Sequence, residues 1–304
     1  MSPPARTFTA IAFGAVLLCA AAAEPRDAED GRDPDRLETK NIFGFTSGTD
    51  IGPEHDREIE LETNLGFGRR TGAYNLGDHV ATFEYNPTDW LEVDTRVRGS
   101  FNRIRGVDGL DDRTGVNFGG AGGKYSFVLV HRTPETPVGF TVSVAPEWLR
   151  VDDAGHTDAA FSAETRIVFD TELVPKVLYA SVNAIYEPLE ARDFGDPAWR
   201  RAAEFGFAAA LAYRIDRALA PGLKHLVLGA ELEYFRAANS LTFAGFAGDS
   251  LWFGPTLYVH LNDTIFVEAA VSTQIAGHAI GDPNPLDLVH FSRNRAQVTL
   301  GIDF

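Results

Sequence analysis

The last seven residues of the chain, VTLGIDF at positions 298–304, alternate between two kinds of side chain. Val298, Leu300, Ile302 and Phe304 are apolar, whereas the three residues between them are small or polar. An alternation with a period of two predicts a β-strand with two unlike faces. This strand would run to the final residue of the chain, and its apolar face would need a solvent or a partner of its own.

The same alternation returns along most of the chain, beginning at Arg57. On nearly every segment, the residues at every second position are apolar and those between them are polar or charged. Val93 and Val97, for example, alternate with Asp94 and Arg96. We call these two sets of alternate positions the apolar and the polar parity. The expected strands cover residues 57–67, 79–85, 91–102, 117–131, 139–150, 159–171, 177–187, 202–215, 224–236, 250–261, 264–278 and 289–304. Twelve is an even number, and segments of this length suit tilted membrane strands.

The expected connections give a second indication of the same fold, because short and long ones tend to alternate. Short connections fall at 86–89, 173–176 and 262–263, and long ones at 104–116, 188–200, 237–248 and 279–288. Periplasmic turns and extracellular loops of bacterial barrels differ in this way. We therefore expect an all-β fold, a closed antiparallel transmembrane β-barrel of about 12 strands in an up-and-down meander. A soluble two-sheet sandwich also alternates, but the strand lengths and the apolar outer parity favour the barrel.

The C-terminal strand resembles the assembly signal of outer-membrane β-barrels of Gram-negative bacteria, with Phe304 as the terminal aromatic residue. Three segments, FGFTSGTDIG (43–52), FGRRTGAY (67–74) and HFSRNRAQVTLGIDF (290–304), look like a porin-like, uncharacterised family of such barrels. The resemblance implies outer-membrane lipid around the barrel and recognition of the C-terminal strand by the barrel-assembly machinery. Its motifs are structural and assign no catalytic residue.

The N-terminus has the features of an export signal. Arg6 precedes a short apolar run, and the alanines at 21–23 offer a cleavage site before Glu24. We expect a signal peptide at 1–23, a flexible acidic segment at 24–56 and the barrel at 57–304. Within the acidic segment, 41–53 has aromatic residues and glycines, so it would either pack locally or enter the barrel mouth.

Composition excludes several classes of function. The formal net charge of −16 argues against nucleic acid as a partner. The single cysteine, Cys19, lies in the expected signal peptide, so no disulfide framework or thiolate metal site is expected. The histidines show no metal-binding spacing, and the glycines at 119–123 fall within a strand pattern rather than in a phosphate-binding loop. We expect no cofactor and no metal.

The polar parity would face the barrel interior and is strongly charged. About twenty ionisable groups could not be accommodated unpaired in a dry core. The expected lumen-lining residues are Glu58, Glu60, Glu62, Glu92, Asp94, Arg96, Arg98, Glu164, Arg166, Glu231, Glu233, Arg293 and Arg295. Arg293 and Arg295 of the last strand would pair with the glutamates of the first strand and fix the closing register. The same charges could form a selectivity wall with a mild preference for cations.

We expect a porin-like channel or passive transporter for small polar solutes in the outer membrane, with its oligomeric state open. The first alternative is an occluded structural or surface-interaction barrel, which inward folding of 41–53 would favour. The second is a rim hydrolase, which would need Asp111 or Asp112 to meet His156. His290 and Ser292 would share the outward parity of the last strand, without an evident orienting acid.

Overall fold

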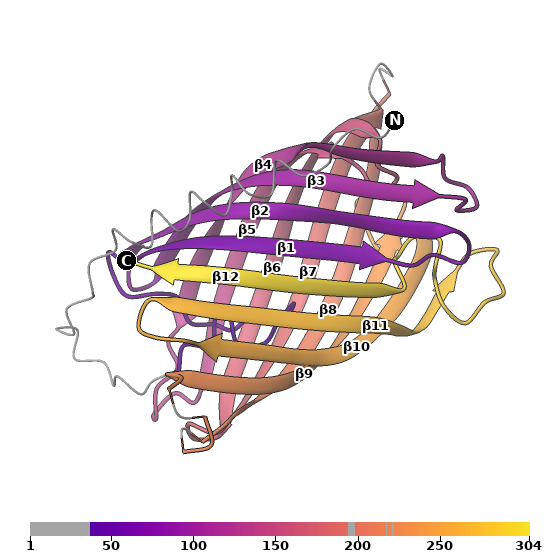
Figure 1. Cartoon of the computed structure of the whole chain (residues 1–304). Coiled ribbons are helices and arrows are strands. Elements are labelled where there is room, and N and C mark those ends of the chain that lie inside the picture. Colours follow the sequence, from indigo (N-terminus) through magenta and orange to yellow (C-terminus); the bar gives the residue numbers. More distant parts are fainter. Residues whose placement is uncertain (1–36, 194–197, 217, 221) are drawn as a thin grey trace, which may run out of the picture.

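The computed structural model describes residues 37–193, 198–216, 218–220 and 222–304. The expected signal peptide at 1–23 lies outside these residues, as does the first part, 24–36, of the expected flexible segment. The described residues form an antiparallel barrel of twelve strands in a simple meander (Figure 1). Among them there is no helix long and apolar enough to cross a membrane.

The strands follow one another around the barrel in chain order. They are β1 (Arg57–Phe67), β2 (Ala73–Thr88), β3 (Leu91–Arg105), β4 (Arg113–Val130), β5 (Val138–Val151), β6 (Thr157–Val174), β7 (Leu178–Asp193), β8 (Arg200–Arg214), β9 (His225–Ala238), β10 (Phe246–His260), β11 (Ile265–Ala279) and β12 (Asn294–Asp303). β12 pairs with both β11 and β1, so the sheet closes without a free edge. The expectation of a closed twelve-stranded meander is confirmed.

The two faces of the wall differ as the alternation predicts. Outward side chains such as Val97, Phe161 and Phe207 are exposed, whereas the inward Glu92 and Asn183 are buried. In a membrane barrel the outward apolar side chains face lipid, and every strand hydrogen bond is satisfied by a neighbouring strand. The charged parity is therefore the inner face.

The two ends of the barrel are distinguished by their connections. At one end, here called the turn end, lie the first residue of β1, the last residue of β12 and the tight connections at 89–90 and 175–177. The opposite end, here called the loop end, carries the connections at 68–72 and 280–293. Phe304 follows β12 at the turn end, where its main-chain N donates to the Arg57 carbonyl at 3.0 Å.

The last strand is shorter than expected, since it begins at Asn294 rather than at 289. The residues before it belong to the loop 280–293, which turns into the barrel mouth. Asp287 in this loop is fully buried, and the Gln274 side chain on β11 donates to the Asp287 carbonyl at 3.1 Å. Arg69 also donates to the main-chain carbonyls of Val289 and Phe291, at 2.8 Å each. These contacts divert the chain from the sheet and end the strand early.

Candidate functional site in the barrel lumen

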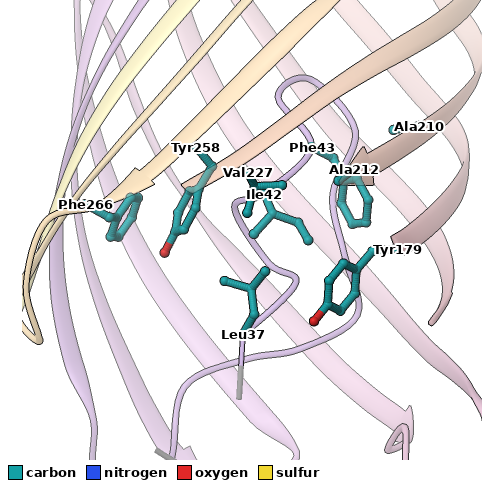
Figure 2. Close-up of a cluster of buried hydrophobic side chains, with 9 residues drawn as sticks. All are labelled: Leu37, Ile42, Phe43, Tyr179, Ala210, Ala212, Val227, Tyr258 and Phe266. Carbon is teal, nitrogen blue, oxygen red and sulfur yellow. The ribbon is translucent and has the colours of Figure 1, made fainter. Parts of the chain in front are cut away.

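Residues 37–56 are here called the inner segment. Most of it, 37–52, lies inside the barrel, whereas Glu54 and His55 are exposed. Leu37, Ile42 and Phe43 are at most 2% exposed and pack against inward side chains of the wall (Figure 2). Their partners on the wall are Tyr179, Ala210, Ala212, Val227, Tyr258 and Phe266. The expectation of a flexible segment therefore does not describe residues 37–56. The alternative, that 41–53 enters the barrel, is what the structure shows.

The inner segment is a loop whose two arms lie side by side. Thr39 donates from its main-chain N to Asp50 Oδ2 at 2.9 Å, and from its hydroxyl to the same oxygen at 3.0 Å. At the tip of the loop, Gly44 adopts φ +91°, and a Cβ there would come within 2.7 Å of the Ala270 Cβ. Glycine is required at this position because both the backbone conformation and the close approach exclude a side chain.

Two glutamates of the wall hold the tip through its main chain. Glu231 Oε2 on β9 accepts from the main-chain N and from the hydroxyl of Thr46, each at 3.0 Å. Glu231 Oε1 accepts from the Phe45 N at 3.3 Å, and Glu268 Oε1 on β11 accepts from the Gly44 N at 2.6 Å. Hydrogen bonds to ionised acceptors are the stronger ones. These two acids therefore act as acceptors for the otherwise unpaired amide groups of the segment.

The opposite side of the inner segment is held by β6 and β7. Asn183 accepts from the Ser47 N at 2.8 Å and donates to the Ser47 carbonyl at 2.9 Å. Asp170 accepts from the Thr49 N at 2.9 Å and from its hydroxyl at 2.7 Å. Arg166 Nη1 donates to the Phe45 carbonyl at 3.1 Å. The segment is thus hydrogen-bonded to the wall on two sides, in addition to its apolar contacts.

Lys40 lies among three carboxylates near the turn end. Its Nζ is 3.3 Å from Glu58 Oε2 and 3.0 Å from Glu92 Oε2, and it contacts Glu84 directly. Burial lowers the pKa of Lys40, but the surrounding carboxylates outweigh it and hold that pKa well above its usual value. Lys40 is therefore charged at neutral pH. Carboxylate oxygens of Glu58, Glu60 and Glu84 lie within 4.8 Å of one another, and the ammonium group of Lys40 is their cation.

A second set of ion pairs covers the inner face of β3 to β6. Arg96 Nη2 lies 3.1 Å from Asp94 Oδ2, and Lys124 Nζ lies 3.3 Å from the same oxygen. Arg98 bridges Asp78 at 2.9 Å and Glu147 at 2.8 Å. Arg166 lies 3.0 Å from Glu164. The charges of this wall are paired mainly with one another, so the wall keeps a hydrophilic surface without isolated buried charges.

A cavity of about 340 Å³, here called the lower cavity, separates the inner segment from this charged wall. It is lined by nine acidic and five basic side chains, so its surface carries net negative charge. The lining includes seven of the expected residues: Glu60, Glu62, Glu92, Arg96, Arg98, Glu164 and Arg166. Asp94, Glu58 and Glu231 take part through the ion pairs and hydrogen bonds described above.

The expected pairing of the last strand with the first is wrong. Glu58 lies opposite Asp303, and Arg295 lies opposite Gly66 at the other end of β1. Arg295 instead pairs with Glu233 on β9, and its guanidinium lies over the rings of Trp252 (4.2 Å) and Phe45 (4.7 Å). Arg293 precedes β12, is exposed and does not line the lumen. Glu62 accepts from Gln297 at 2.6 Å, so an amide rather than an arginine faces it across the seam.

A second cavity of about 350 Å³, here called the upper cavity, lies toward the loop end. Phe45 of the inner segment and Arg98 line both cavities. His290 and Ser292, expected to face outward, line the upper cavity because the loop 280–293 turns inward. Asp287 Oδ2 lies 2.9 Å from His290 Nδ1, so the histidine does have an orienting acid.

The residues proposed for a rim hydrolase do not come together. His156 pairs with Asp152 of its own loop, at 3.4 Å. Asp112 accepts from the Gly106 N at 2.6 Å. Among the described residues, no hydrogen bond or ion pair joins His156 to Asp111 or Asp112. Sequence reasoning also missed Lys40, which is the only lysine or arginine between 37 and 56.

A closed meander with an apolar outer face and a charged lumen defines an outer-membrane β-barrel. The model of the family of unknown function DUF6662 matches residues 36–304, and the chain belongs to this family. No curated protein sequence matches the chain.

Solved structures share the fold at low sequence identity. The COG4313 outer membrane channel from Pseudomonas putida F1 superposes with a TM-score of 0.58 and 12% identity, covering 84% of this chain and 98% of the channel. The NanC porin gives a TM-score of 0.46 and 7% identity, covering 81% of this chain and 98% of the porin. LpxR from Salmonella typhimurium gives 0.44 and 8%, covering 81% and 99%. At such identities the likeness establishes the fold alone.

Proposed function

We propose that this barrel is an outer-membrane channel for small polar solutes, and that the inner segment occludes its turn end. The observation that carries this function is the lower cavity, a charged space between the wall of β1 to β6 and the inner segment. A structural barrel has no need of a hydrated space lined by paired charges, whereas a conduction path does. The fold shared with a COG4313 outer membrane channel is consistent with the same role.

The membrane orientation follows from the two ends. The turn end, with both ends of the barrel sequence, faces the periplasm, and the loop end faces the outside. Residues 1–23 direct export, and the C-terminal strand with Phe304 is the part presented to the assembly machinery. The lumen-lining glutamates and arginines act on the solute, and the excess of acids gives a mild preference for cations.

Single-channel recording in planar bilayers tests this function. The protein should conduct rarely, because the inner segment occupies the lumen, whereas a variant lacking residues 37–52 should conduct steadily. Neutral substitutions in the lower cavity, Glu62→Gln and Arg96→Gln, should shift the ion preference of the open variant in opposite directions. A folded barrel lacking 37–52 that never conducts would rule out the channel.

The occluded structural barrel is the second candidate, and the inner segment is the observation that favours it. Its apolar contacts and its hydrogen bonds to Glu231, Asn183 and Asp170 describe a segment that is firmly docked. The two candidates differ in whether the segment ever leaves. Cysteines introduced at Ser47 and Ser181, two residues joined by a hydrogen bond from the Ser181 hydroxyl to the Ser47 carbonyl at 2.6 Å, would lock it by a disulfide. Conductance lost on oxidation and restored on reduction identifies the channel.

We assign no reaction to the barrel, although Asp287 and His290 form a pair of the kind that hydrolases use. In this loop Asp287 Oδ1 also accepts from the main-chain N of Val289 and of His290, at 3.0 Å each. These bonds account for the pair as a support of the loop fold. Ester hydrolysis by the purified barrel that disappears in His290→Ala but not in His156→Ala would show that a catalytic role exists.

A further inference from the structure

The upper cavity has the dimensions and the composition of a ligand pocket. Its volume of about 350 Å³ falls within the range of small-molecule sites. Its walls come from β1 to β3, β8 to β10, β12 and the loop 280–293, and Phe45 at the tip of the inner segment also lines it. A ligand in this cavity would touch both the fixed wall and the inner segment.

The basic side chains of the upper cavity are already engaged. Arg98 is bridged by Asp78 and Glu147, and Arg295 is paired with Glu233 and stacked on aromatic rings. Arg69 points its guanidinium at the main-chain carbonyls of the loop 280–293 and lies 4.6 Å from the Tyr74 ring centre. Each guanidinium thus has at least one acceptor within the protein, although the Nε atoms of Arg69 and Arg295 have none among the described residues.

Glu204 on β8 differs from these residues. Its carboxylate lines the upper cavity and has no hydrogen bond or ion pair to any residue that the structure describes. It lies directly opposite Glu187 on β7, and like charges opposite one another in a sheet are unfavourable. Asp153, at the rim of the same cavity, adds a second carboxylate. A cation in the upper cavity would relieve this repulsion.

Aromatic and aliphatic side chains form much of the remaining wall, beside the polar Asn64, Asp78, His290 and Ser292. Phe291 packs edge-on against Trp252 with ring centres 5.2 Å apart, and Phe235 lies 6.0 Å from Trp252. Leu76 and Ala296 complete the apolar surface. Such a wall provides little for an inorganic ion, which prefers a shell of oxygen ligands. It suits an apolar body that carries a single charged group.

We propose that the upper cavity is a binding site for an organic cation, with its ammonium group on Glu204 and its apolar body against Phe291 and Trp252. Organic cations with an apolar body would then be the class of solute that the channel carries, and this conclusion rests on the proposed function. Because the cavity is lined by Phe45, an occupied site also contacts the inner segment at the residues that Arg166 and Glu231 hold.

Equilibrium binding to the purified barrel in detergent tests the site without requiring conductance. Phenethylamine, a primary ammonium on an aromatic body, is the probe, and phenylacetate, its anionic counterpart, is the comparison. Isothermal titration should detect phenethylamine binding and no phenylacetate binding. Glu204→Gln should weaken phenethylamine about tenfold, because the charge-assisted contact is lost. Equal binding of both probes, no binding of phenethylamine, or an unchanged affinity in Glu204→Gln would overturn the site.

Glu187→Gln is the matched control, since Glu187 is the cross-strand partner of Glu204 but lines the lower cavity. It should weaken phenethylamine by no more than about threefold, because Glu187 adds to the repulsion on Glu204 without contacting the ligand. Asp153→Asn, in a loop, is a second variant if Glu204→Gln fails to fold, and it should weaken binding in the same direction. Binding to the natural protein, together with an absence of conductance in the variant lacking 37–52, would keep this site and discard the channel.

Discussion

The inner faces of β1 to β6 and of β7 to β11 are built for different neighbours. On β3 to β6 charged inward side chains pair with one another along the wall of the lower cavity. On β8 the inward positions 208, 210 and 212 are alanines, all buried. The acids of β9 and β11 accept main-chain amides of the inner segment. The first wall therefore mainly faces the lower cavity, apart from its contacts with Lys40, Phe45 and Thr49, and the other wall mainly faces the inner segment.

This difference shows how a narrow barrel can hold a segment and still keep a hydrated space. Small side chains on one side of the lumen leave room for the segment, and apolar contacts there supply the free energy of docking. Ion pairs on the other side hold the long charged side chains close to the wall. If this division is correct, substitutions on the two sides should have different effects.

The largest effect is expected at Lys40, the charged contact between the inner segment and the first wall. Lys40→Met would remove the cation that Glu58 and Glu84 share, whereas Glu92 keeps Lys124 at 3.4 Å. Removal of one member of a buried ion pair costs about 3–5 kcal/mol. The melting temperature in detergent should fall clearly. The melting temperature of Lys40→Arg, which keeps the charge, should fall much less. Equal losses in both variants would mean that packing rather than charge is responsible.

The same contact predicts a pH dependence with a definite sign. The folded-state pKa of Lys40 is raised, so its contribution to stability is complete below the unfolded value of about 10.4 and is lost as pH rises through the folded value. The difference in melting temperature between the natural protein and Lys40→Met should therefore be constant from neutral pH to about pH 10 and then shrink. A difference that vanishes near neutral pH would contradict the charged state of Lys40.

Phe43 tests the apolar wall. Phe43→Ala removes a fully buried ring from the cluster of Figure 2 and should weaken docking of the inner segment by about 3 kcal/mol, at the lower end for such truncations. The fraction of time spent conducting should rise, and the segment should become susceptible to protease added at the turn end. The barrel itself should remain folded, as judged by heat-modifiable mobility in gels. Occlusion as complete as in the natural protein would contradict docking by this cluster.

A smaller effect is expected at Glu231. Glu231→Gln replaces one of two acceptor oxygens by an amide nitrogen that cannot accept, and should weaken docking by about 1–2 kcal/mol through the bonds to Phe45 and Thr46. Conductance should rise less than in Phe43→Ala. Glu147→Gln is the control on the charged wall, since Glu147 pairs with Arg98 and does not bond the inner segment. An equal rise in both variants would show that the two walls are not distinct.

The smallest effect is expected on ion preference. In a variant opened by deletion of 37–52, Glu147→Gln should lower the ratio of cation to anion permeability, and Arg98→Gln should raise it, each by about twofold. Reversal potentials in asymmetric salt measure the ratio. Equal permeability ratios in both variants would show that the charged wall does not line the conduction path.

Much of the fold could be predicted from the sequence, because a strand between lipid and a charged lumen must alternate. The pairing of Arg293 and Arg295 with the first strand could not hold, since antiparallel closure places the end of β12 against the start of β1. Glu58 then meets Asp303, and Arg295 is carried to the loop end. This register could have been inferred from the chain ends alone. The inward turn of 280–293 could not, because it depends on tertiary contacts that leave no periodic pattern in the sequence.

The inner segment shows the same limit of sequence reasoning. Residues 37–56 have no period because each side chain meets a different part of the wall. Two signals were nevertheless present. Alanines occupy three successive inward positions of β8, where a lumen filled only by water would not need small apolar side chains. Gly44 and Gly48 lie close together in a stretch that contains aromatic residues, as expected for a tight loop. A Cβ at Gly48 would come within 2.2 Å of the Thr39 carbonyl oxygen, so the narrow loop depends on its absence.

The hydrogen bonds between Thr39 and Asp50 bear on the order in which the molecule can be assembled. Because the two arms lie side by side and the second arm leads into β1 at the turn end, the loop enters and leaves by the same opening. Within residues 37–56, no part of the chain has to be threaded through the barrel. The seam between β1 and β12 can therefore close first and the loop can dock afterwards, or undock and return, without breaking a single strand pair.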